Sequence, residues 1–498
     1  MRSVTAHLPA LQVVVPLVGA LLSGLFRRGT LAWAFALAVA WIMPVISVTL
    51  LAQVLAGGPI SYHLGGWAPP WGIEYRVDLL NGFVLVLVSV VGAVIMPFAR
   101  RSVAHEIDGD KQAWFYTMYL LCLTGLLGIT ITGDAFNVFV FLEISSLSTY
   151  VLIALGRDRR ALLAAYQYLI MGTIGATFYV IGIGLLYLVT GSLNIVDIAA
   201  RLGPAAAEAH RPVLAAFAFL TVGISLKLAL FPLHVWLPGA YAHAPSVATA
   251  FLAGTATKVA IYVLLRLFFS VFGVAIDFRT LPISEMMLVL SVAAMFIASV
   301  LAVFEEDLKR MLAFSSLAQI GYITLGIAIA NVPGLTGGIV HLLNHALMKT
   351  ALFLSLGAIL YRVGSIKLGD LGGIGRRMPL TMGAFVVGGL ALIGVPGTAG
   401  FVSKWYLAVG AIEKGWWPLT FLILASSMIA VVYIGRVVEV AWFREPTGAA
   451  ALAKDPPWSM LAPLLLLAAA TVYLGIDTEA SASIARKVAE GLIGGLHK

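Results

Sequence analysis

The sequence predicts an all-α polytopic membrane protein with about 14 transmembrane helices. Of the 498 residues, 61% are hydrophobic and only 11% are charged, and the mean hydropathy is +1.00. Soluble domains carry roughly 25% charged residues, so this composition excludes a soluble protein. A helix needs about 20 apolar residues to cross a bilayer, so the chain has room for many spans and little mass outside the membrane.

Apolar runs separated by charged or Gly- and Pro-rich connections give the predicted spans in order. They are 8–26, 31–56, 79–98, 113–132, 135–155, 162–189, 212–231, 245–269, 281–303, 309–330, 336–360, 379–411, 417–440 and 459–475. The segment 57–78, rich in Gly, Pro and Trp, is typical of an extramembrane loop with interfacial aromatic residues. The first run has no clear cleavage signal and is interpreted as a retained span.

Basic residues indicate the orientation of these spans. Connections that follow odd-numbered spans, such as the one with Arg27 and Arg28, carry more Lys and Arg than the opposite side. The positive-inside rule therefore predicts a multi-pass protein of the cell (inner) membrane with both termini on the non-cytoplasmic side. Because the basic residues are scattered through short loops, the net charge of +8 indicates membrane orientation and not nucleic-acid binding.

Four lysines fall inside predicted spans, namely Lys227, Lys258, Lys349 and Lys404. A charge at the bilayer centre costs about 2.5–3.5 kcal/mol even on permissive scales, so each needs water or a partner. Lys227 precedes Pro232, and Lys404 follows the "GVPG" segment 394–397, so both are expected beside interrupted helices. Interrupted helices in corresponding positions of two halves are typical of transporters, where they line hydrated cavities.

Glu143, near the middle of span 135–155, is predicted to pair with Lys227. A nearby cation keeps a buried carboxylate ionised, and forming or breaking the pair would change the field at the next lysine. Buried lysines release their protons more readily than hydrated ones, which makes lysine a workable proton carrier. The alternative interpretation is a static ion pair that only holds two helices together.

The stretch "HLLNHALMKTALF" places His341, His345 and Lys349 at i, i+4 and i+8, on one face of a helix. Histidine exchanges protons near neutral pH, so this face predicts part of a proton relay, which Lys258 in span 245–269 would link to Lys227. Two alternatives stay open, namely helix–helix hydrogen bonds and zinc binding by the two histidines. Zinc binding is disfavoured because the glutamate of an HExxH motif is missing and Cys122 is the only cysteine.

No bound cofactor is predicted. A single cysteine excludes an internal disulfide and a cysteine-based cluster, and the chain shows neither a phosphate-binding loop nor a dinucleotide fingerprint after a strand.

Several motifs together resemble one family. "GDAFNVFVFLEISSLSTY", "SLKLALFPLHVWLPGAY", "TKVAIYVLLR", "EDLKRMLAFSSLAQIGY", "HLLNHALMKTALFL" and "GFVSKWYL" are similar to the antiporter-like subunits of respiratory complex I, group 4 membrane hydrogenases and Mrp-type cation/proton antiporters. Within this group the chain most resembles the D subunit of Mrp antiporters, because it lacks the long C-terminal extensions of the largest subunits and carries Lys404 in place of a glutamate.

The resemblance implies a domain organisation with two inverted five-helix repeats. Spans 4–8 would form the first repeat and spans 9–13 the second, with helices 7 and 12 broken. The corresponding segments are three N-terminal helices in 1–112, the repeats in 113–269 and 281–441, and helix 14 with a short tail in 459–498.

The resemblance also implies roles for the residues found above. Glu143 and Lys227 would interact in the first half-channel, and Lys258 would be the central lysine. His341, His345 and Lys349 would form the connecting relay, and Lys404 would serve the second half-channel.

The sequence therefore predicts a proton-translocating subunit, not an enzyme by itself, of a multisubunit Na⁺/H⁺ antiporter. Its expected partners are other membrane subunits, protons, sodium ions and the bilayer. One alternative is a proton-pumping subunit of a redox complex like complex I or a group 4 hydrogenase. Two further alternatives are a non-transporting scaffold and an intramembrane metalloprotein.

Overall fold

The computed structural model describes residues 5–273, 282–446 and 448–496, which are nearly all helical. The prediction of an all-α polytopic membrane protein is confirmed. In the described part, 12 helices are long and apolar enough to cross a membrane, and α2 and α17 are shorter apolar helices. The count of 14 spans and the inverted relation of the repeats stay predictions. The predicted repeat boundary at residue 281 and the two chain ends lie outside the described residues.

The helices before the first interruption are α2 (Leu8–Ser23), α3 (Gly29–Gly57), α4 (Leu79–Glu106), α5 (Gln112–Ile131), α6 (Ala135–Ala154), α7 (Arg160–Thr190), α8 (Ile195–Glu208) and α9 (His210–Leu228). The predicted loop 57–78 contains a short antiparallel hairpin of β1 (Ile60–His63) and β2 (Glu74–Val77), with the 3₁₀ turn η1 (Leu64–Gly66) between them. Ile60 pairs with Val77 and His63 pairs with Glu74.

The middle of the chain consists of α10 (Trp236–His243), α11 (Ser246–Gly254), α12 (Ala256–Leu265), the π-helical turn η2 (Arg266–Val271), α13 (Ile283–Phe304), α14 (Leu308–Ile329) and α15 (Val332–Val363). The remaining elements are η3 (Leu368–Leu371), α16 (Ile374–Arg377), α17 (Pro379–Ile393), α18 (Ala399–Glu413), α19 (Trp417–Phe443), α20 (Gly448–Leu452), α21 (Trp458–Ile476) and α22 (Glu479–Leu496).

Short polar side chains start several of these helices. Asp78 accepts hydrogen bonds from the backbone of Leu80 and Asn81 in the first turn of α4, and the Asn81 side chain accepts from the Asp78 backbone. Asp134 caps α6, and Asp307 caps α14 through Arg310 N at 3.0 Å. These caps satisfy backbone N–H groups that a helix start leaves without intrahelical partners.

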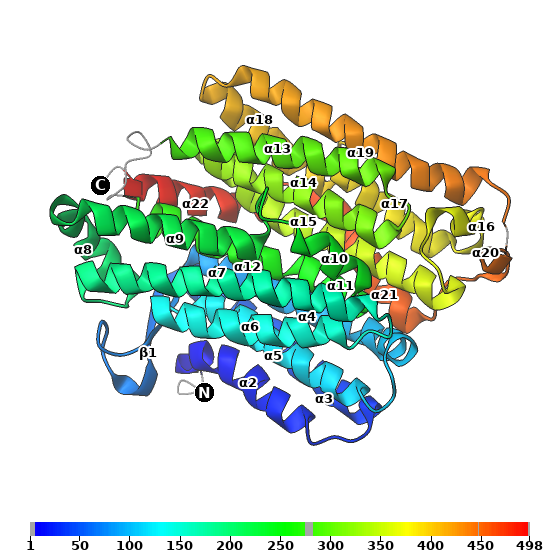
Figure 1. Ribbon diagram of the computed structural model, residues 1–498, viewed down its shortest axis with the longest axis horizontal. Helices are drawn as coiled ribbons and strands as arrows, with labels where there is room; N and C mark the ends of the chain where they lie inside the picture. Colours follow the sequence, from blue (N-terminus) through cyan, green and yellow to red (C-terminus); the bar gives the residue numbers. More distant parts are fainter. Residues whose placement is uncertain (1–4, 274–281, 447, 497–498) are drawn as a thin grey trace.

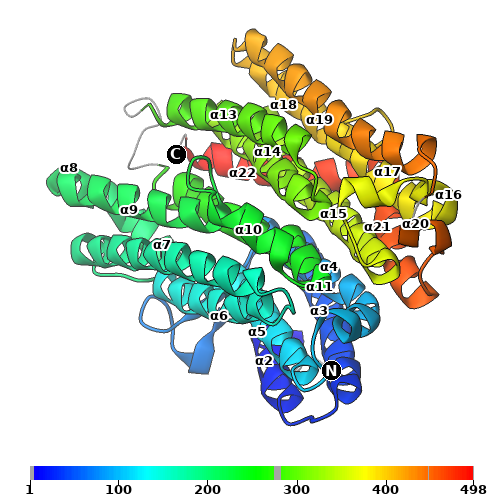
Figure 2. The same ribbon diagram turned by 45° about the vertical axis from the view of Figure 1, so that its right-hand side comes forward.

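The helices lie side by side in one bundle with α15 in its interior. Figure 1 shows α8 and β1 at one end of the bundle and α16 and α20 at the other. Figures 1 and 2 both place α18 and α19 along one edge and α2 and α3 along the opposite edge. α15 packs against α11, α14, α17, α18, α21 and α22, so polar residues on its faces are shielded from lipid.

Three chain interruptions position the candidate site. The two interruptions expected from Pro232 and from 394–397 are present, between α9 and α10 and between α17 and α18. The third was not predicted, because span 245–269 was expected to be continuous and instead divides into α11 and α12 at Thr255. Thr255 has φ −127° and ψ −56°, and its hydroxyl donates to Phe251 O at 2.6 Å, a local bond that competes with the helical ladder.

Candidate functional site

Lys227 lies in the last turn of α9, where the first interruption begins. The residue is only 6% exposed, and its Nζ donates a hydrogen bond to Ser146 Oγ on α6 at 2.7 Å. After Leu228 the chain leaves the helix through Ala229, which has a left-handed φ of 59°. Because the C-terminal end of a helix attracts cations, the field of α9 stabilises the Lys227 ammonium as well.

Glu143 lies near this lysine, but the predicted direct ion pair is not formed in the structure. Glu143 is half-buried, its Oε1 has no hydrogen-bond partner among the residues that the structure describes, and it interacts with Lys227 only electrostatically. Ser146 follows Glu143 by three residues and therefore shares its face of α6. The Ser146 hydroxyl occupies the position at Lys227 Nζ that the prediction gave to the carboxylate.

Lys258 lies at the unpredicted interruption, in the first turn of α12. The side chain is fully buried, and its Nζ donates to Ala253 O in the last turn of α11. A second, longer contact joins Nζ to Thr257 Oγ1 at 3.4 Å. The break at Thr255 thus exposes a backbone carbonyl group that holds the ammonium without a carboxylate.

The predicted stripe of His341, His345 and Lys349 lies on one uninterrupted helix, α15, and all three side chains are fully buried. His341 Nδ1 lies 2.7 Å from Ser403 Oγ on α18, and its Nε2 lies 2.9 Å from Gln319 Oε1 on α14. Both of its ring nitrogens therefore have hydrogen-bond partners.

His345 stacks on His341 with 6.1 Å between ring centroids and an interplanar angle of 8°. Neither of its ring nitrogens has a hydrogen-bond partner among the described residues. Buried polar groups in native proteins are nearly always paired with protein or water, so the unpaired ring of His345 is an exception within this site. Lys349, one turn further on, donates through Nζ to Leu312 O on α14 at 2.9 Å.

Lys404 lies in α18, next to the second interruption. Its Nζ donates to the last carbonyl groups of α17, Leu392 O and Ile393 O, both at 2.9 Å, and to Ser427 Oγ at 2.7 Å. The ammonium also lies 4.5 Å from the ring centroid of Tyr322, an attractive cation–π distance. As at Lys258, the free carbonyl groups at the end of a half-helix hold the lysine.

Electrostatic interactions connect Glu143 on α6 with Lys227 on α9, and separately connect α12 with α15 and α15 with α18. Lys258 interacts with His345, Lys349 and His341, and His341 interacts with Lys404. The structure thus places the seven predicted residues in two groups. One consists of Glu143 and Lys227, and the other of Lys258, His341, His345, Lys349 and Lys404.

A small cavity extends from Lys227 towards α12. It is lined by Lys227, Ser146, Thr149 and Tyr168 on one side and by Ala256 and Ala260 on the other. Its volume is about 20 Å³, which is enough for one water molecule. The cavity thus offers a place for water between the Lys227 region and the helix that carries Lys258.

The sequence interpretation missed the neutral partners of the site. These partners are Gln319 and Tyr322 on α14, Ser403 on α18 and Ser427 on α19. Of these residues, Gln319 in "SSLAQIGY" could have been identified from the sequence, because an amide inside an apolar span needs a hydrogen-bond partner. The hydroxyl groups give no such signal, since Ser residues are common in membrane helices.

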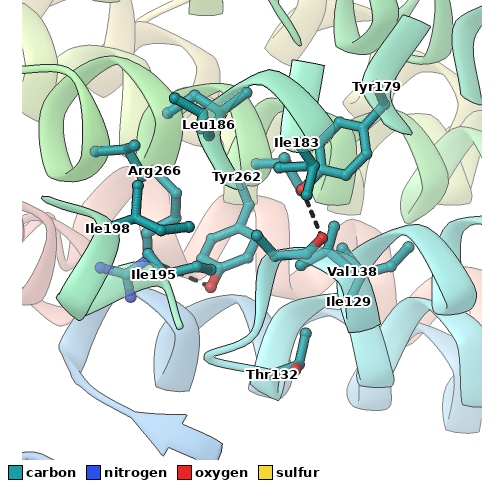
Figure 3. A pocket seen from close by; sticks show the side chains of 14 residues that line it. Ile129, Thr132, Val138, Tyr179, Ile183, Leu186, Ile195, Ile198, Tyr262 and Arg266 are labelled. Carbon is teal, nitrogen blue, oxygen red and sulfur yellow. Dashed lines mark hydrogen bonds between the residues drawn. The ribbon is translucent and has the colours of Figure 1, made fainter. Parts of the chain in front are cut away.

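Two other cations, the buried Lys309 and the half-buried Arg266, lie near carboxylates and away from this site. Lys309 is 3% exposed, donates to Ala244 O at 3.0 Å and lies 3.8 Å from Glu106 Oε2. Arg266 pairs with Asp78 beside a mostly apolar pocket that Tyr179 and Tyr262 help to line. Figure 3 shows that the pocket side chains are mainly aliphatic and aromatic, so this pocket offers little proton-carrying chemistry.

The zinc interpretation of the two histidines finds no support in their surroundings. Both nitrogens of His341 are occupied by Ser403 and Gln319. Within the described ranges, no group of three His, Cys, Asp or Glu side chains is placed to hold a metal ion.

A bundle of membrane helices with lysines held at helix interruptions defines an antiporter-like membrane subunit. Comparisons with known proteins agree, since the sequence profile of the NADH:quinone oxidoreductase/Mrp antiporter transmembrane family matches residues 132–430, and the chain belongs to this family.

Two kinds of relative, a quinone oxidoreductase subunit and antiporter subunits, align with nearly the whole chain. The NADH-quinone oxidoreductase subunit N of Desulforudis audaxviator is 42% identical, over 95% of this chain and 97% of its own. The D subunit of the Na⁺/H⁺ antiporter of Alkalihalophilus pseudofirmus is 30% identical, over 91% and 90% of the two chains. A chain of the Mrp complex from Dietzia sp. superposes with a TM-score of 0.89 at 28% identity, over 99% of both chains.

Proposed function

We propose that this protein is the proton-translocating subunit of a multisubunit Na⁺/H⁺ antiporter, in which protons move along a line of Lys, His and Glu side chains near the bilayer midplane. The observation that carries the proposal is the attachment of Lys227, Lys258 and Lys404 to neutral oxygens at or beside three helix interruptions. A lysine held by carbonyl and hydroxyl oxygens can give up its proton without leaving a buried carboxylate unpaired.

In this proposal each group acts on its neighbour through its charge. Movement of Glu143 towards or away from Lys227 would change the field at Lys258, since α9 and α12 pack together. Lys258 exchanges a proton with His345, and the stacked rings of His345 and His341 carry it towards Lys404, with Lys349 as a side branch. Water molecules beside His345 and in the cavity at Lys227 would connect, by hydrogen bonds, side chains that do not contact each other directly.

The proposal extends to the surroundings of the chain. The named relatives are subunits, so we expect this chain to work beside other membrane subunits in a cell membrane. The distribution of basic residues favours both termini on the non-cytoplasmic side. The relative from Alkalihalophilus pseudofirmus, a Na⁺/H⁺ antiporter subunit, supports Na⁺ as the exchanged cation.

The decisive experiment measures proton flux in proteoliposomes that contain the complete host complex. His345→Gln is the sharpest variant, because His345 has no hydrogen bond to the described residues to lose. We expect the variant complex to assemble normally and to lose at least about tenfold in proton flux, since glutamine cannot exchange protons. Lys258→Gln and Lys404→Gln should act in the same way, and exposed Lys367→Gln serves as the matched control. Normal flux in assembled His345→Gln and Lys258→Gln complexes would contradict the proposal and favour a scaffold.

A second candidate is a proton-pumping subunit of a redox complex. The specific observation in its favour is the 42% identity to a NADH-quinone oxidoreductase subunit N, which exceeds the 30% identity to the D subunit of the antiporter. Both candidates use the same proton path. Proton flux that depends on Na⁺ with no electron donor present supports the antiporter, whereas flux that requires a donor and a quinone supports the redox complex.

A further inference from the structure

A basic groove lies at the end of the bundle opposite β1, where α3, α4, α5 and α15 meet. Its volume is about 550 Å³, and its lining includes Arg100, Arg101, His105, Gln112 and Tyr116. None of these residues belongs to the proposed proton path, and the groove is separate from it.

The two arginines lack carboxylate partners. Arg100 lies 5.2 Å from the ring centroid of Trp33, and the exposed Arg101 has no ion pair among the described residues. The nearest carboxylates are already engaged elsewhere, Glu106 with the backbone and hydroxyl of Ser246 and Asp108 with Lys111. The groove therefore holds two unneutralised guanidinium groups, which favour an anion.

Tyr116 supplies an independent sign of a ligand. Its side chain is only 2% exposed, yet it lines the groove, and its hydroxyl has no hydrogen-bond partner in the described part of the chain. Arg100 is close enough to interact with it electrostatically. The Tyr116 hydroxyl is not one of the enclosed polar atoms, and the residue lines the groove, so the hydroxyl is available to donate a hydrogen bond to an acceptor oxygen there.

Two helix starts add to the positive potential. Gly29 and Thr30 open α3, and Gln112 opens α5; all three line the groove. Neither helix start has a side-chain cap, and a Cβ on Gly29 would lie 2.7 Å from Gln112 Cβ, which shows how closely the two starts approach. Free backbone N–H groups at helix starts bind phosphate oxygens readily.

We propose that this groove binds the phosphate headgroup of an anionic phospholipid. A lipid is the favoured source because the groove lies at the end of membrane-spanning helices, beside Trp114, which is 54% exposed at the start of α5. Basic pockets between transmembrane helices are suited to such headgroups. The phosphate would accept hydrogen bonds from Arg100, Arg101 and the Tyr116 hydroxyl.

The test uses the full-length protein in neutral detergent and measures bound lipid by native mass spectrometry. The probes are dioleoyl phosphatidylglycerol, dioleoyl phosphatidylcholine and inorganic phosphate. Loss of hydrogen bonds to a charged group weakens binding about ten- to a hundredfold, so Arg100→Gln/Arg101→Gln should lose affinity for phosphatidylglycerol by that factor. We expect phosphatidylglycerol to bind at least about tenfold more tightly than phosphatidylcholine, because only the first carries a net negative charge.

Two further variants test whether the double variant loses lipid binding only because it misfolds. Tyr116→Phe removes only the hydroxyl and should weaken phosphatidylglycerol binding severalfold, and Arg377→Gln, an exposed arginine away from the groove, should leave it unchanged. Equal binding of both lipids, or equal affinity of the double variant and the Arg377→Gln control, would overturn the proposal. Competition by inorganic phosphate at matched concentration would also overturn it, because the groove would then recognise free phosphate and not lipid.

Discussion

Gly400→Ala should disrupt the second interruption and with it the position of Lys404. Gly400 lies in the first turn of α18, and a Cβ at this position would overlap Ala391 O and lie 2.8 Å from Ala391 C in α17. Real Cβ atoms do not approach other atoms within 3.0 Å, so the two half-helices must move apart. A displacement of about 1 Å takes the 2.9 Å bonds from Lys404 to Leu392 O and Ile393 O out of hydrogen-bonding range.

The expected loss of stability follows from these contacts. Two hydrogen bonds from an ammonium group contribute about 1.5–3 kcal/mol each, so their loss costs about 3–6 kcal/mol. Overpacking adds about 1–3 kcal/mol, and replacing a helical glycine by alanine returns about 0.5–1 kcal/mol. We therefore expect the free energy of unfolding to fall by about 3–8 kcal/mol.

Unfolding by SDS in mixed micelles measures this difference, and proton flux in the assembled complex measures its consequence. Gly383→Ala is the matched control, because Gly383 lies in α17 and a Cβ there meets nothing within 4 Å. The reasoning is refuted if Gly400→Ala unfolds with the same free energy as Gly383→Ala and keeps its proton flux.

Two further predictions concern other parts of the bundle. In Gly223→Ala the new Cβ would lie 2.7 Å from Gly175 O, so α7 and α9 must separate. The free energy of unfolding should therefore fall by about 1–3 kcal/mol. Gly184→Ala is the control, because a Cβ at Gly184 meets nothing within 4 Å and should not lower the free energy of unfolding. At the membrane surface, hydrogen bonds from Lys111 and Arg157 lower the pKa of Asp108. A carboxyl group whose pKa is lowered by folding stabilises the protein above its unfolded pKa of about 3.9 and loses this contribution as the pH falls through its folded pKa. Asp108→Asn should therefore reduce the acid sensitivity of the unfolding midpoint below about pH 5.

The sequence predicted the helix interruptions only where proline or glycine clusters break the backbone ladder. Pro232 and the 394–397 segment are such signals, and both interruptions are present. The break at Thr255 has no proline, and Thr255 follows a single glycine in an apolar run, so a continuous span was expected there. The helix α22 was also missed, because its charged face lowers its hydropathy below that of a span.

Side-chain partners were less predictable than the helices. The face shared by His341, His345 and Lys349 follows from helical spacing alone. The partners of His341 do not, because Gln319 and Ser403 are 22 and 62 residues away in the sequence. The Glu143–Lys227 pair shows the same difficulty of predicting side-chain partners. Helical position places Glu143 and Ser146 on one face of α6, and in the structure the Lys227 ammonium donates its hydrogen bond to Ser146.

The partners of the buried cations separate two kinds of role. Arg266 pairs with Asp78, and Lys309 lies 3.8 Å from Glu106 in addition to its hydrogen bond to Ala244 O, so neutralising one member of either pair would leave a carboxylate or a cation without its counter-charge. These pairs therefore favour one protonation state and suit the structural role that the scaffold hypothesis gave to all buried ions. Lys258 and Lys404 are held by carbonyl and hydroxyl oxygens, which accept a hydrogen bond from an ammonium or from an amine alike. A neutral Lys258 keeps enough N–H groups for its two oxygen contacts, whereas a neutral Lys404 has two N–H groups for three oxygens and gives up one hydrogen bond. Neither lysine leaves a paired carboxylate behind when its charge changes, which is the property that a proton path requires.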